Sequence, residues 1–409
     1  MALPTYAAQP QEGTGETDGY KLVWQDLFDG EELNMNRWNI EVNGSGGGNN
    51  ELQYYTDRSE NVRVGDDGEG NGCLILTARR EDYKGKNFTS GRVNSMGKIA
   101  FTHGKIEAAI KLPKTANGLW PAFWMMGNDY SKVGWPRCGE TDIMEMGNSE
   151  GIRNGAQERF FNGACHWGQG WPNASYAKST TKSYSLQDGE FHLFTCIWDE
   201  NSIKMYVDLD KTPVQNPYYA IDIPQDDPDN EWSAGNYFHK DNFILFNLAV
   251  GGNFTGIHDA NNITALNDDN GQEASYYINY VKIYQKGLDN ENQSFADAGD
   301  SLDELDPGFQ IPGNDDDITD NPETNDPNEE PGLEEGGNGG TSAVNSFQAG
   351  TAGIYYDGKT ITGQPPVVVY SLDGRILTHS ADGEVSTINF QPGIYVARSA
   401  DTSRKILVK

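Results

Sequence analysis

Residues 104–112 alternate between two kinds of side chain, and this alternation limits what the chain can fold into. The first set is Ile106, Ala108, Ile110 and Leu112, and the second is Lys105, Glu107, Ala109 and Lys111. A period of two is that of a β-strand, so the segment predicts a sheet with one covered face. Residues 203–209 repeat the pattern, whereas the nearly continuous apolar run at 243–250 predicts a central strand buried on both faces. No helical stretch of convincing length occurs between residues 20 and 286, and the predicted fold class is therefore all-β.

The 409 residues are too many for one ordinary domain, and their composition divides them into four parts. Residues 1–18 are rich in Gly, Pro and Thr, and are interpreted as a flexible leader. Residues 19–286 carry the strand patterns of the main domain. Residues 287–341 are interpreted as an acidic, disordered linker, because 287–340 hold 17 Asp and Glu without a single Lys or Arg. Residues 342–409 return to short strand patterns and predict a small C-terminal β-sandwich.

The formal net charge of −31 disfavours nucleic acid and anionic membranes as partners. No run of eighteen apolar residues is present, so no transmembrane segment is predicted. Residues 1–9 also lack the features of a secretory signal. The cysteines form no C-x-x-C pair and no zinc spacing, and small buried thiols are favoured over a disulfide framework, although three pairings are formally possible. They are Cys73, Cys138, Cys165 and Cys196.

An acidic strand follows a loop marked by Gly and Pro, in the stretch from Gly134 to Glu145. Glu140 and Asp142 are two positions apart, so on a strand they point to the same face, about 7 Å from each other. In a regular strand Glu145 would face the opposite, apolar side, where an unpaired carboxylate is costly. A β-bulge between Asp142 and Glu145 would return Glu145 to the face of the other two acids. The pattern therefore predicts three carboxylates on one wall of a cleft.

Two carboxyl groups facing each other across a cleft fit glycoside hydrolysis, because one has to be ionised and the other protonated before the bond breaks. Asp142 between them would supply a charge or a hydrogen bond that separates their pKa values. Cys138 and His166 could be a thiol nucleophile pair, but nothing in the sequence orients them and a structural thiol is favoured. The three acids with His166 could instead ligate a divalent ion, although the nearby Trp residues favour a sugar ring.

Aromatic residues accompany the acids in two further stretches. Residues 49–56 interleave polar and aromatic side chains, which fits a cleft for hydroxyl-rich ligands and a half-buried edge strand equally well. Residues 118–127 should mostly be core, and each of Trp120 and Trp124, taken singly, is more often core than a platform for a sugar.

Several motifs, in this order, resemble glycoside hydrolase family 16, the laminarinase and mixed-linkage β-glucanase group. They are the segments 49–56, 90–92, 118–124, 134–145 and 247–252. The resemblance covers about residues 20–286. It implies a β-jelly-roll (concanavalin-like) sandwich with an open curved cleft, and a retaining, endo-acting mechanism on β-glucan.

The same resemblance implies roles for individual residues. Glu140 would be the nucleophile, Glu145 the acid/base and Asp142 the residue that tunes them, and the E-x-D-x-x-E form is that of the laminarinase branch. The side chains that would bind glucosyl units near the cleavage point are Asn50, Arg92, Trp120 and Trp135. His166 would support the acidic part of the site.

Two positions depart from the family pattern. Thr141 replaces a branched aliphatic residue, which a packed face tolerates. By the same resemblance, Asn279 stands where the family often has an Asp that ligates a structural calcium ion, so calcium is possible but disfavoured here. The expected catalytic chemistry requires no cofactor and no metal.

Three segments of the tail, at 369–375, 393–396 and 405–409, resemble the C-terminal sorting domain of the Bacteroidetes type IX secretion route. That likeness implies type IX machinery as a partner and a secreted or cell-surface location, whereas a generic accessory β-sandwich is the alternative. The expected function is a monomeric endo-β-glucanase acting on β-1,3- or mixed β-1,3-1,4-glucans. The alternatives are a non-catalytic β-glucan-binding protein on the same fold and an enzyme for another polysaccharide, such as a galactan.

Overall fold

The computed structural model describes residues 19–302, except 214 and 225, and strand segments near the C-terminus. Those segments are 355–356, 359–362, 367–371, 376–380, 384–386, 393–399 and 402–408. The expected leader at 1–18 and the part of the expected linker from 303 to 341 lie outside the described residues. The chain divides into two compact units, of which the first holds residues 19–302 and the second holds the C-terminal strands.

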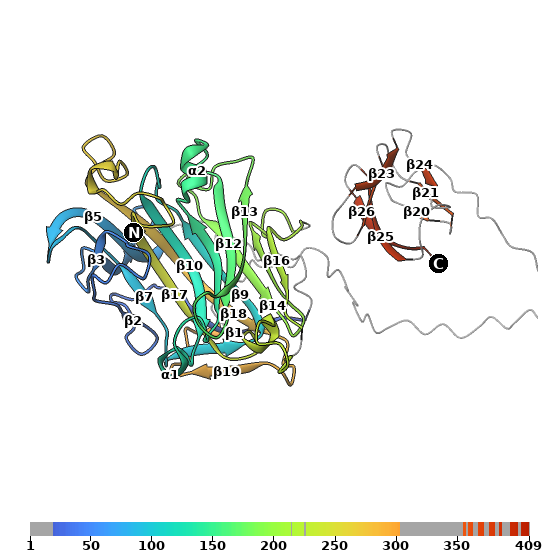
Figure 1. Cartoon of the computed structure of the whole chain (residues 1–409), viewed down its shortest axis with the longest axis horizontal. Helices are drawn as coiled ribbons and strands as arrows, with labels where there is room; N and C mark the ends of the chain where they lie inside the picture. Colours follow the sequence, from blue (N-terminus) through green and yellow to red (C-terminus); the bar gives the residue numbers. More distant parts are fainter. Residues whose placement is uncertain are drawn as a thin grey trace, which may run out of the picture. The chain divides into compact units, whose positions relative to one another are not determined.

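The first unit contains a ten-stranded sheet (Figure 1). Its strands are β1 (Lys21–Asp26), β3 (Gln53–Tyr55), β4 (Val62–Asp66), β5 (Gly72–Tyr83), β6 (Lys86–Ser90), β9 (Gly104–Lys111), β14 (His192–Trp198), β15 (Ser202–Val207), β16 (Tyr219–Asp222) and β18 (Glu273–Gln285). They follow the order β16-β15-β14-β9-β18-β5-β6-β3, with β1 beside β18 and β4 beside β5. β3 and β6 pair in parallel, and the neighbours of β9 and β18 are antiparallel.

A nine-stranded sheet forms the second layer and carries the acidic strand. Its strands are β2 (Asn39–Ile40), β7 (Arg92–Asn94), β8 (Ile99–Thr102), β10 (Leu119–Gly127), β11 (Glu140–Met146), β12 (Phe160–Trp167), β13 (Ala174–Thr181), β17 (Asn242–Val250) and β19 (Asn292–Phe295). The order is β13-β12-β11-β10-β17-β7-β2, with β8 between β17 and β19. Helical turns are short: α1 (Tyr130–Val133), α2 (Ser149–Arg153), and the 3₁₀ turns η1 (Ala234–Asn236) and η2 (Ala260–Asn262).

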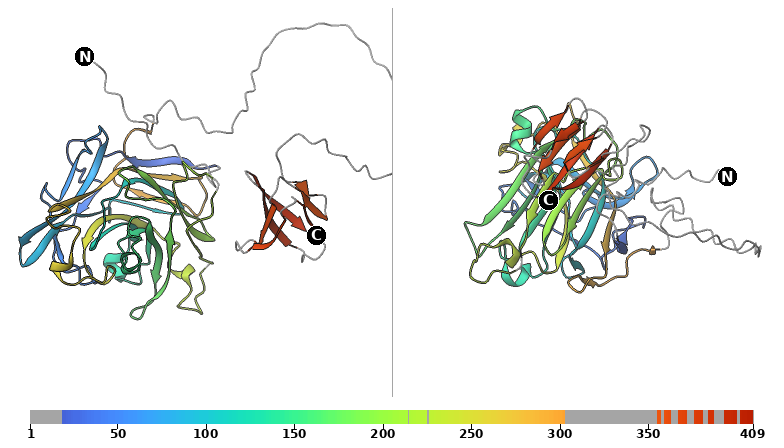
Figure 2. Two further views of the ribbon diagram at one scale, coloured as in Figure 1. Left: turned by 90° about the horizontal axis from the view of Figure 1, so that it is seen from above. Right: turned by 90° about the vertical axis from the view of Figure 1, so that its right-hand side faces the viewer.

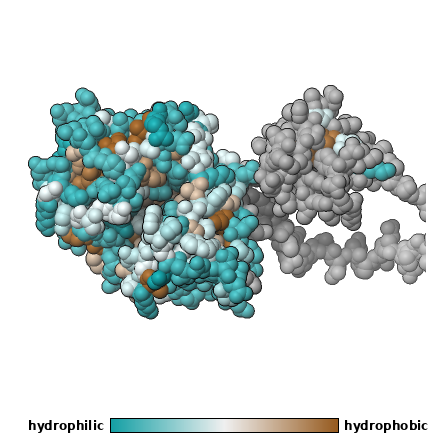
Figure 3. Space-filling view, in the orientation of Figure 1, coloured by the Kyte–Doolittle hydropathy of each residue, from teal (hydrophilic) through white to brown (hydrophobic). Residues whose placement is uncertain are grey.

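The two sheets lie face to face around one large hydrophobic core (Figure 2). Leu74, Ile106 and Phe194 enter it from the ten-stranded sheet, and Phe123 and Phe246 enter it from the nine-stranded sheet, where their rings stack. The surface seen in Figure 3 is mostly hydrophilic over the described residues, with small apolar patches. The all-β prediction is confirmed, and the architecture is a β-jelly-roll sandwich. β17 is the central strand that the apolar run predicted, because all nine of its residues are buried.

β9 differs from the prediction of one covered face, because its polar side is buried as well. Lys105 and Glu107 form an ion pair of 2.8 Å there, and Lys105 lies over the ring of Tyr284. Ala109 on the same side packs against Tyr280 and other apolar side chains. Large aromatic residues of β18 therefore cover a face on which the alternation of lysine and glutamate indicated solvent.

The sheet also continues past residue 286, where the main domain was expected to end. β19 pairs with β8, and Arg37 binds Asp297 and Asp300 at 2.8 Å each. The predicted boundary is therefore too early, since residues 292–300 belong to the first unit. Their acidic, polar composition is that of a linker, but these acids neutralise a nearly buried arginine.

The C-terminal strands form two small sheets. The strands are β20 (Tyr355–Tyr356), β21 (Thr360–Thr362), β22 (Val367–Ser371), β23 (Ile376–Ser380), β24 (Glu384–Ser386), β25 (Gly393–Ser399) and β26 (Thr402–Val408). Their orders are β20-β21-β24 and β23-β22-β25-β26.

All four cysteines are buried free thiols, as predicted. Among the described helices, none has the length and apolar character needed to cross a membrane.

Candidate active site

A β-bulge in β11 brings the three acids to one face of the nine-stranded sheet. Glu140 lies opposite His166 of β12, Asp142 lies opposite Ala164, and Glu145 lies opposite Asn162. Three steps along β11 therefore match only two steps along β12 between Asp142 and Glu145, which is the extra residue of a bulge. The pairing with β10 shifts at the same place. The predicted bulge is confirmed, and it leaves two consecutive residues, Ile143 and Met144, in the core.

Each of the two glutamates accepts a hydrogen bond from a different tryptophan. The indole Nε1 of Trp120 donates to Oε1 of Glu145 at 3.0 Å, and the Trp135 side chain donates to Glu140. The Trp120 ring is nearly buried and stacks on Phe254, with 4.6 Å between ring centroids. Trp120 is thus a fixed donor as well as a core residue, and Trp135 is a partly exposed donor.

The surroundings of Glu140 and Glu145 push their pKa values up to different extents. Burial raises the pKa of Glu140 to about 7, against the opposing effects of the Arg92 charge and the Trp135 hydrogen bond. Burial and the negative charge of Glu140 raise the pKa of Glu145 to about 8, opposed only by the Trp120 hydrogen bond. The repulsion between the two carboxylates acts on both equally, whereas the Arg92 cation stabilises the ionised form of Glu140 in particular, so Glu140 loses its proton first. Glu145 then retains its proton at a pH where Glu140 is ionised.

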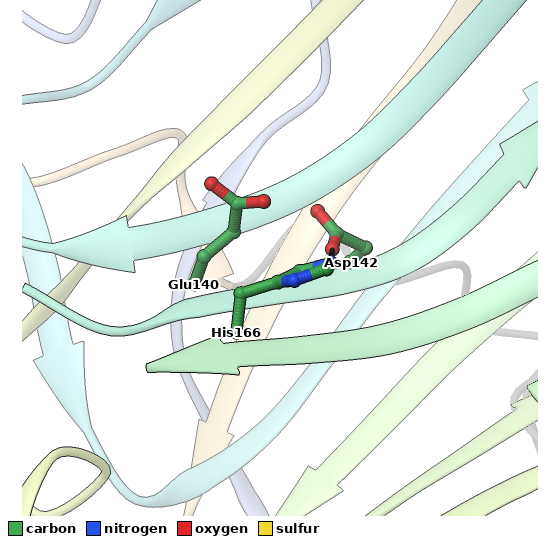
Figure 4. A group of neighbouring side chains, drawn as sticks. All are labelled: Glu140, Asp142 and His166. Atoms are coloured by element: carbon green, nitrogen blue, oxygen red, sulfur yellow. Dashed lines mark ion pairs between the residues drawn. The ribbon is translucent and has the colours of Figure 1, made fainter. Parts of the chain in front are cut away.

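Asp142 and His166 face each other beside Glu140 (Figure 4). Nε2 of His166 lies 3.5 Å from Oδ2 of Asp142. Burial and the charges of both glutamates raise the pKa of Asp142 well above its ordinary value, whereas burial lowers the pKa of His166. Both shifts favour the neutral form of each group and therefore oppose an ion pair across this contact. The Nδ1 atom of His166 lies 3.4 Å from the Asn173 amide.

Arg92, on β7, is held in place from two sides. Its Nε donates to Glu41 at 2.9 Å, and its guanidinium lies over the ring of Trp124 at 4.9 Å from the centroid. Trp124 in turn donates from Nε1 to Oδ1 of Asn247 at 2.8 Å. Arg92 is therefore a fixed positive charge on the Glu140 side of the acids.

Asn50 contacts a neighbouring loop. It is exposed, has a φ of 57°, and donates from Nδ2 to Asn253 at 3.1 Å. Asn253 precedes Phe254, the residue that stacks on Trp120. The structure therefore places Asn50 near the Glu145 side of the site through this neighbouring loop.

Sequence analysis did not identify Phe254, which stacks on Trp120, or Glu41, which binds Arg92. Phe254 lies just two positions after the motif at 247–252, so its neighbourhood was a usable signal. Glu41 lies 51 positions before Arg92, and no local pattern links the two residues. Ion pairs between distant strands depend on sheet order, which a single sequence does not display.

Two places bear on metal binding. Ligand atoms of Glu140, Asp142 and His166 lie within 4.8 Å of one another, so these side chains have the donor types for a divalent cation. At the position of the structural calcium implied by the family, Nδ2 of Asn279 donates to the carbonyl oxygen of Gly72 at 2.8 Å. An N–H group presents positive charge to an oxygen that would otherwise face the cation, so the residues present do not fit calcium there.

Comparison with known proteins identifies the family of this chain. The family profile described as "Glycosyl hydrolases family 16" matches residues 49–229. "Beta-glucanase" of Rhodothermus marinus is 32% identical, over 65% of this chain and 85% of the relative. "Clotting factor G alpha subunit" of Tachypleus tridentatus is 33% identical, over 65% of this chain but only 34% of that longer protein.

Solved structures extend the comparison. A Bacteroides ovatus mixed-linkage glucan GH16 protein, solved with a G4G4G3G product, is 42% identical with a TM-score of 0.55, over 64% of this chain and 100% of that one. The catalytic domain of an endo-1,3-beta-glucanase (laminarinase) from Thermotoga petrophila is 30% identical with a TM-score of 0.51, over 66% and 99% respectively. The chain belongs to glycosyl hydrolase family 16.

Proposed function

We propose that this protein is a retaining endo-β-glucanase that hydrolyses β-1,3- and mixed-linkage β-1,3-1,4-glucans. The observation that carries the proposal is the bulged strand β11, which presents Glu140, Asp142 and Glu145 on one face with a separate indole donor to each glutamate. The substrate class is supported by the similar proteins described as a beta-glucanase, a mixed-linkage glucan protein and a laminarinase.

Glu140 acts as the nucleophile and Glu145 as the acid/base. The Glu140 carboxylate attacks the anomeric carbon while Glu145 donates its proton to the departing glycosidic oxygen, which leaves a glucosyl ester on Glu140. Glu145, now a carboxylate, takes a proton from water, and the water oxygen attacks the same carbon and releases Glu140. Two inversions give net retention. The order in which the glutamates lose their protons supports this assignment, because the group beside Arg92 ionises first.

Asp142 and His166 assist as a neutral pair. A neutral Asp142 adds no negative charge beside Glu140, and the His166 ring lies 3.5 Å from the Asp142 carboxyl group. Arg92, Trp120, Trp135 and Asn50 bind glucosyl units near the cleavage point. In this arrangement the polar edge of each indole fixes a glutamate, and the exposed ring of Trp135 also offers an apolar surface to a sugar.

Product analysis on laminarin, lichenan and agarose tests the proposal. We expect reducing ends from laminarin and lichenan, mainly as oligosaccharides, and none from agarose. Glu140→Ser should release no reducing ends while it still migrates more slowly in gels that contain β-glucan. A wild-type protein that binds these glucans without cutting them would support the non-catalytic alternative, and cleavage of agarose alone would support a galactanase.

We also propose that the protein is exported, with the C-terminal unit as the sorting signal. Support comes from the sequence of the tail at 369–375, 393–396 and 405–409. Fractionation of the native cells, probed with antibody against the catalytic unit, should find the full chain on the cell surface or in the medium and a chain truncated at residue 341 retained inside the outer membrane. Equal distribution of the two chains would contradict the proposal.

A further inference from the structure

The exposed tryptophans of this protein are gathered in one place. All nine tryptophans lie within residues 19–302, and three of them are substantially exposed. These are Trp135, Trp171 and Trp232, with exposed fractions of 41%, 83% and 45%. An exposed indole is costly in water, and three of them on neighbouring loops indicate a surface that binds a partner with apolar faces.

Hydrogen bonds tie these three loops together. Trp135 lies in the loop between α1 and β11, Trp171 lies in the hairpin between β12 and β13, and Trp232 lies just before η1. Nε of Arg137 donates to the carbonyl of Gln169 at 2.7 Å, and Nε2 of Gln169 donates to the hydroxyl of Tyr237 at 2.9 Å. That hydroxyl donates to the carbonyl of Glu231 at 2.7 Å. The loops therefore form one connected body.

The hairpin and the Trp232 loop also touch directly. Nε1 of Trp167 donates to the carbonyl of Trp232 at 2.9 Å. A Cβ atom at Gly168 would lie 3.4 Å from Cζ3 of Trp232, so the Trp232 ring passes close to the backbone of the hairpin. Trp232 is thereby held in position on one side while its other side remains exposed.

This connected body adjoins the catalytic acids. Trp135 donates to Glu140, and the hairpin begins directly after the strand that carries His166, the cross-strand neighbour of Glu140. Asn173 of the hairpin returns to His166 with a contact of 3.4 Å. A chain-like ligand that occupies the site at Glu140 can therefore continue over these loops without leaving the surface.

We propose that Trp171 and Trp232 form a second glucan-binding platform, continuous with Trp135, which holds glucosyl units several positions away from the bond that is cut. The occupant is the β-glucan substrate itself, so the inference rests on the proposed function. Glucosyl rings expose apolar C–H faces and an equatorial rim of hydroxyls, and an indole matches both, with its ring against the C–H face and Nε1 as a donor. The loop before Trp232 exposes Asp226, Asp227 and Asp229, which disfavour an anionic occupant and are compatible with an uncharged polysaccharide.

Kinetics on long and short substrates test the platform. For the double variant Trp171→Ala/Trp232→Ala we expect the KM for lichenan to rise about ten-fold with little change in kcat, because one to two stacking contacts correspond to that factor. On a nitrophenyl trisaccharide, too short to reach the loops, kcat/KM should stay within about two-fold of wild type. The Trp→Phe double variant keeps the rings and should recover most of the affinity for lichenan.

Met35→Ala is the matched control, because Met35 is also an exposed apolar residue and lies outside these loops. It should leave both substrates unaffected. An unchanged KM for lichenan in the double alanine variant would overturn the platform while the proposed function stands. Equal losses on both substrates would also overturn it, since they indicate a general structural effect. A wild-type protein inactive on every β-glucan would overturn the proposed function, and the platform with it.

Discussion

Glu140 and Glu145 are the same residue type in the same strand, and their neighbours give them different tasks. Arg92 and Trp135 stabilise a negative charge on Glu140, whereas Glu145 has the Trp120 donor and the repulsion of Glu140. Glu41 and Trp124 hold Arg92 in place, so the difference between the two acids depends on residues from four strands or loops.

Removal of the Arg92 charge should shift the pH dependence in a defined direction. Without this cation the pKa of Glu140 rises further, so the nucleophile is ionised only at higher pH. For Arg92→Gln we therefore expect the acidic limb of the kcat/KM profile on lichenan to move to higher pH. At a fixed pH on that limb, kcat/KM should fall about ten-fold for each pH unit by which the limb has moved.

Arg92→Lys retains the positive charge and serves as the control, and its acidic limb should stay near that of wild type. The basic limb reports the ionisation of Glu145 and should move little in either variant. The pKa of Glu145 is set by burial, by the charge of Glu140 and by the Trp120 hydrogen bond rather than by Arg92. A folded Arg92→Gln enzyme with an unshifted acidic limb would show that Arg92 does not set the ionisation of the nucleophile.

At the scale of elements, the sequence of β11 was informative because its acids are out of phase with a regular strand. Two consecutive core residues, Ile143 and Met144, are the structural counterpart of that irregularity. β9 was misleading for the opposite reason, since its alternation is regular but both faces are buried. The alternation separates polar from apolar side chains but does not tell exposed from buried ones, since Lys105 and Glu107 form an ion pair inside the protein.

Strand β18 contributes a prediction about calcium. Asn279 donates to the Gly72 carbonyl, so a chelator should leave the melting temperature of the wild-type protein unchanged. In Asn279→Asp a carboxylate faces that carbonyl oxygen, and the repulsion should lower the melting temperature in EDTA and be relieved by added calcium.

Elemental analysis of the dialysed proteins completes this test. We expect no calcium in the wild-type protein and about one ion per chain in Asn279→Asp after calcium is added. A wild-type protein that retains calcium and loses thermal stability in EDTA would show that the amide does not replace the ion.

At the scale of the whole molecule, the extent of the first unit was the part least accessible from the sequence. Residues 292–300 have the composition of the linker that follows them, and only the sheet order reveals that β19 pairs with β8. Asp297 and Asp300 neutralise Arg37, about 260 positions earlier in the chain. The jelly-roll and the acids could be predicted because strand alternation and the bulge are local, whereas these contacts are not.

Two truncated chains test this boundary. A chain of residues 19–286 loses β19 and two of the three carboxylates beside the nearly buried Arg37, which leaves it with Asp26 alone. Loss of partners from a buried charge costs about 3–5 kcal/mol, so this chain should unfold at clearly lower urea concentration than a chain of residues 19–302. Equal unfolding midpoints would place the boundary at residue 286 after all.

Covalent labelling of the enzyme shows whether Glu140 itself attacks the glucan. A 2-deoxy-2-fluoro β-glucan oligosaccharide with an activated leaving group slows the hydrolysis of the glucosyl ester and allows the labelled enzyme to be digested and sequenced by mass spectrometry. We expect one label per chain on Glu140, and no label in Glu140→Ser. A label on Asp142 or Glu145, or rapid turnover of β-glucan without any labelled enzyme, would contradict it.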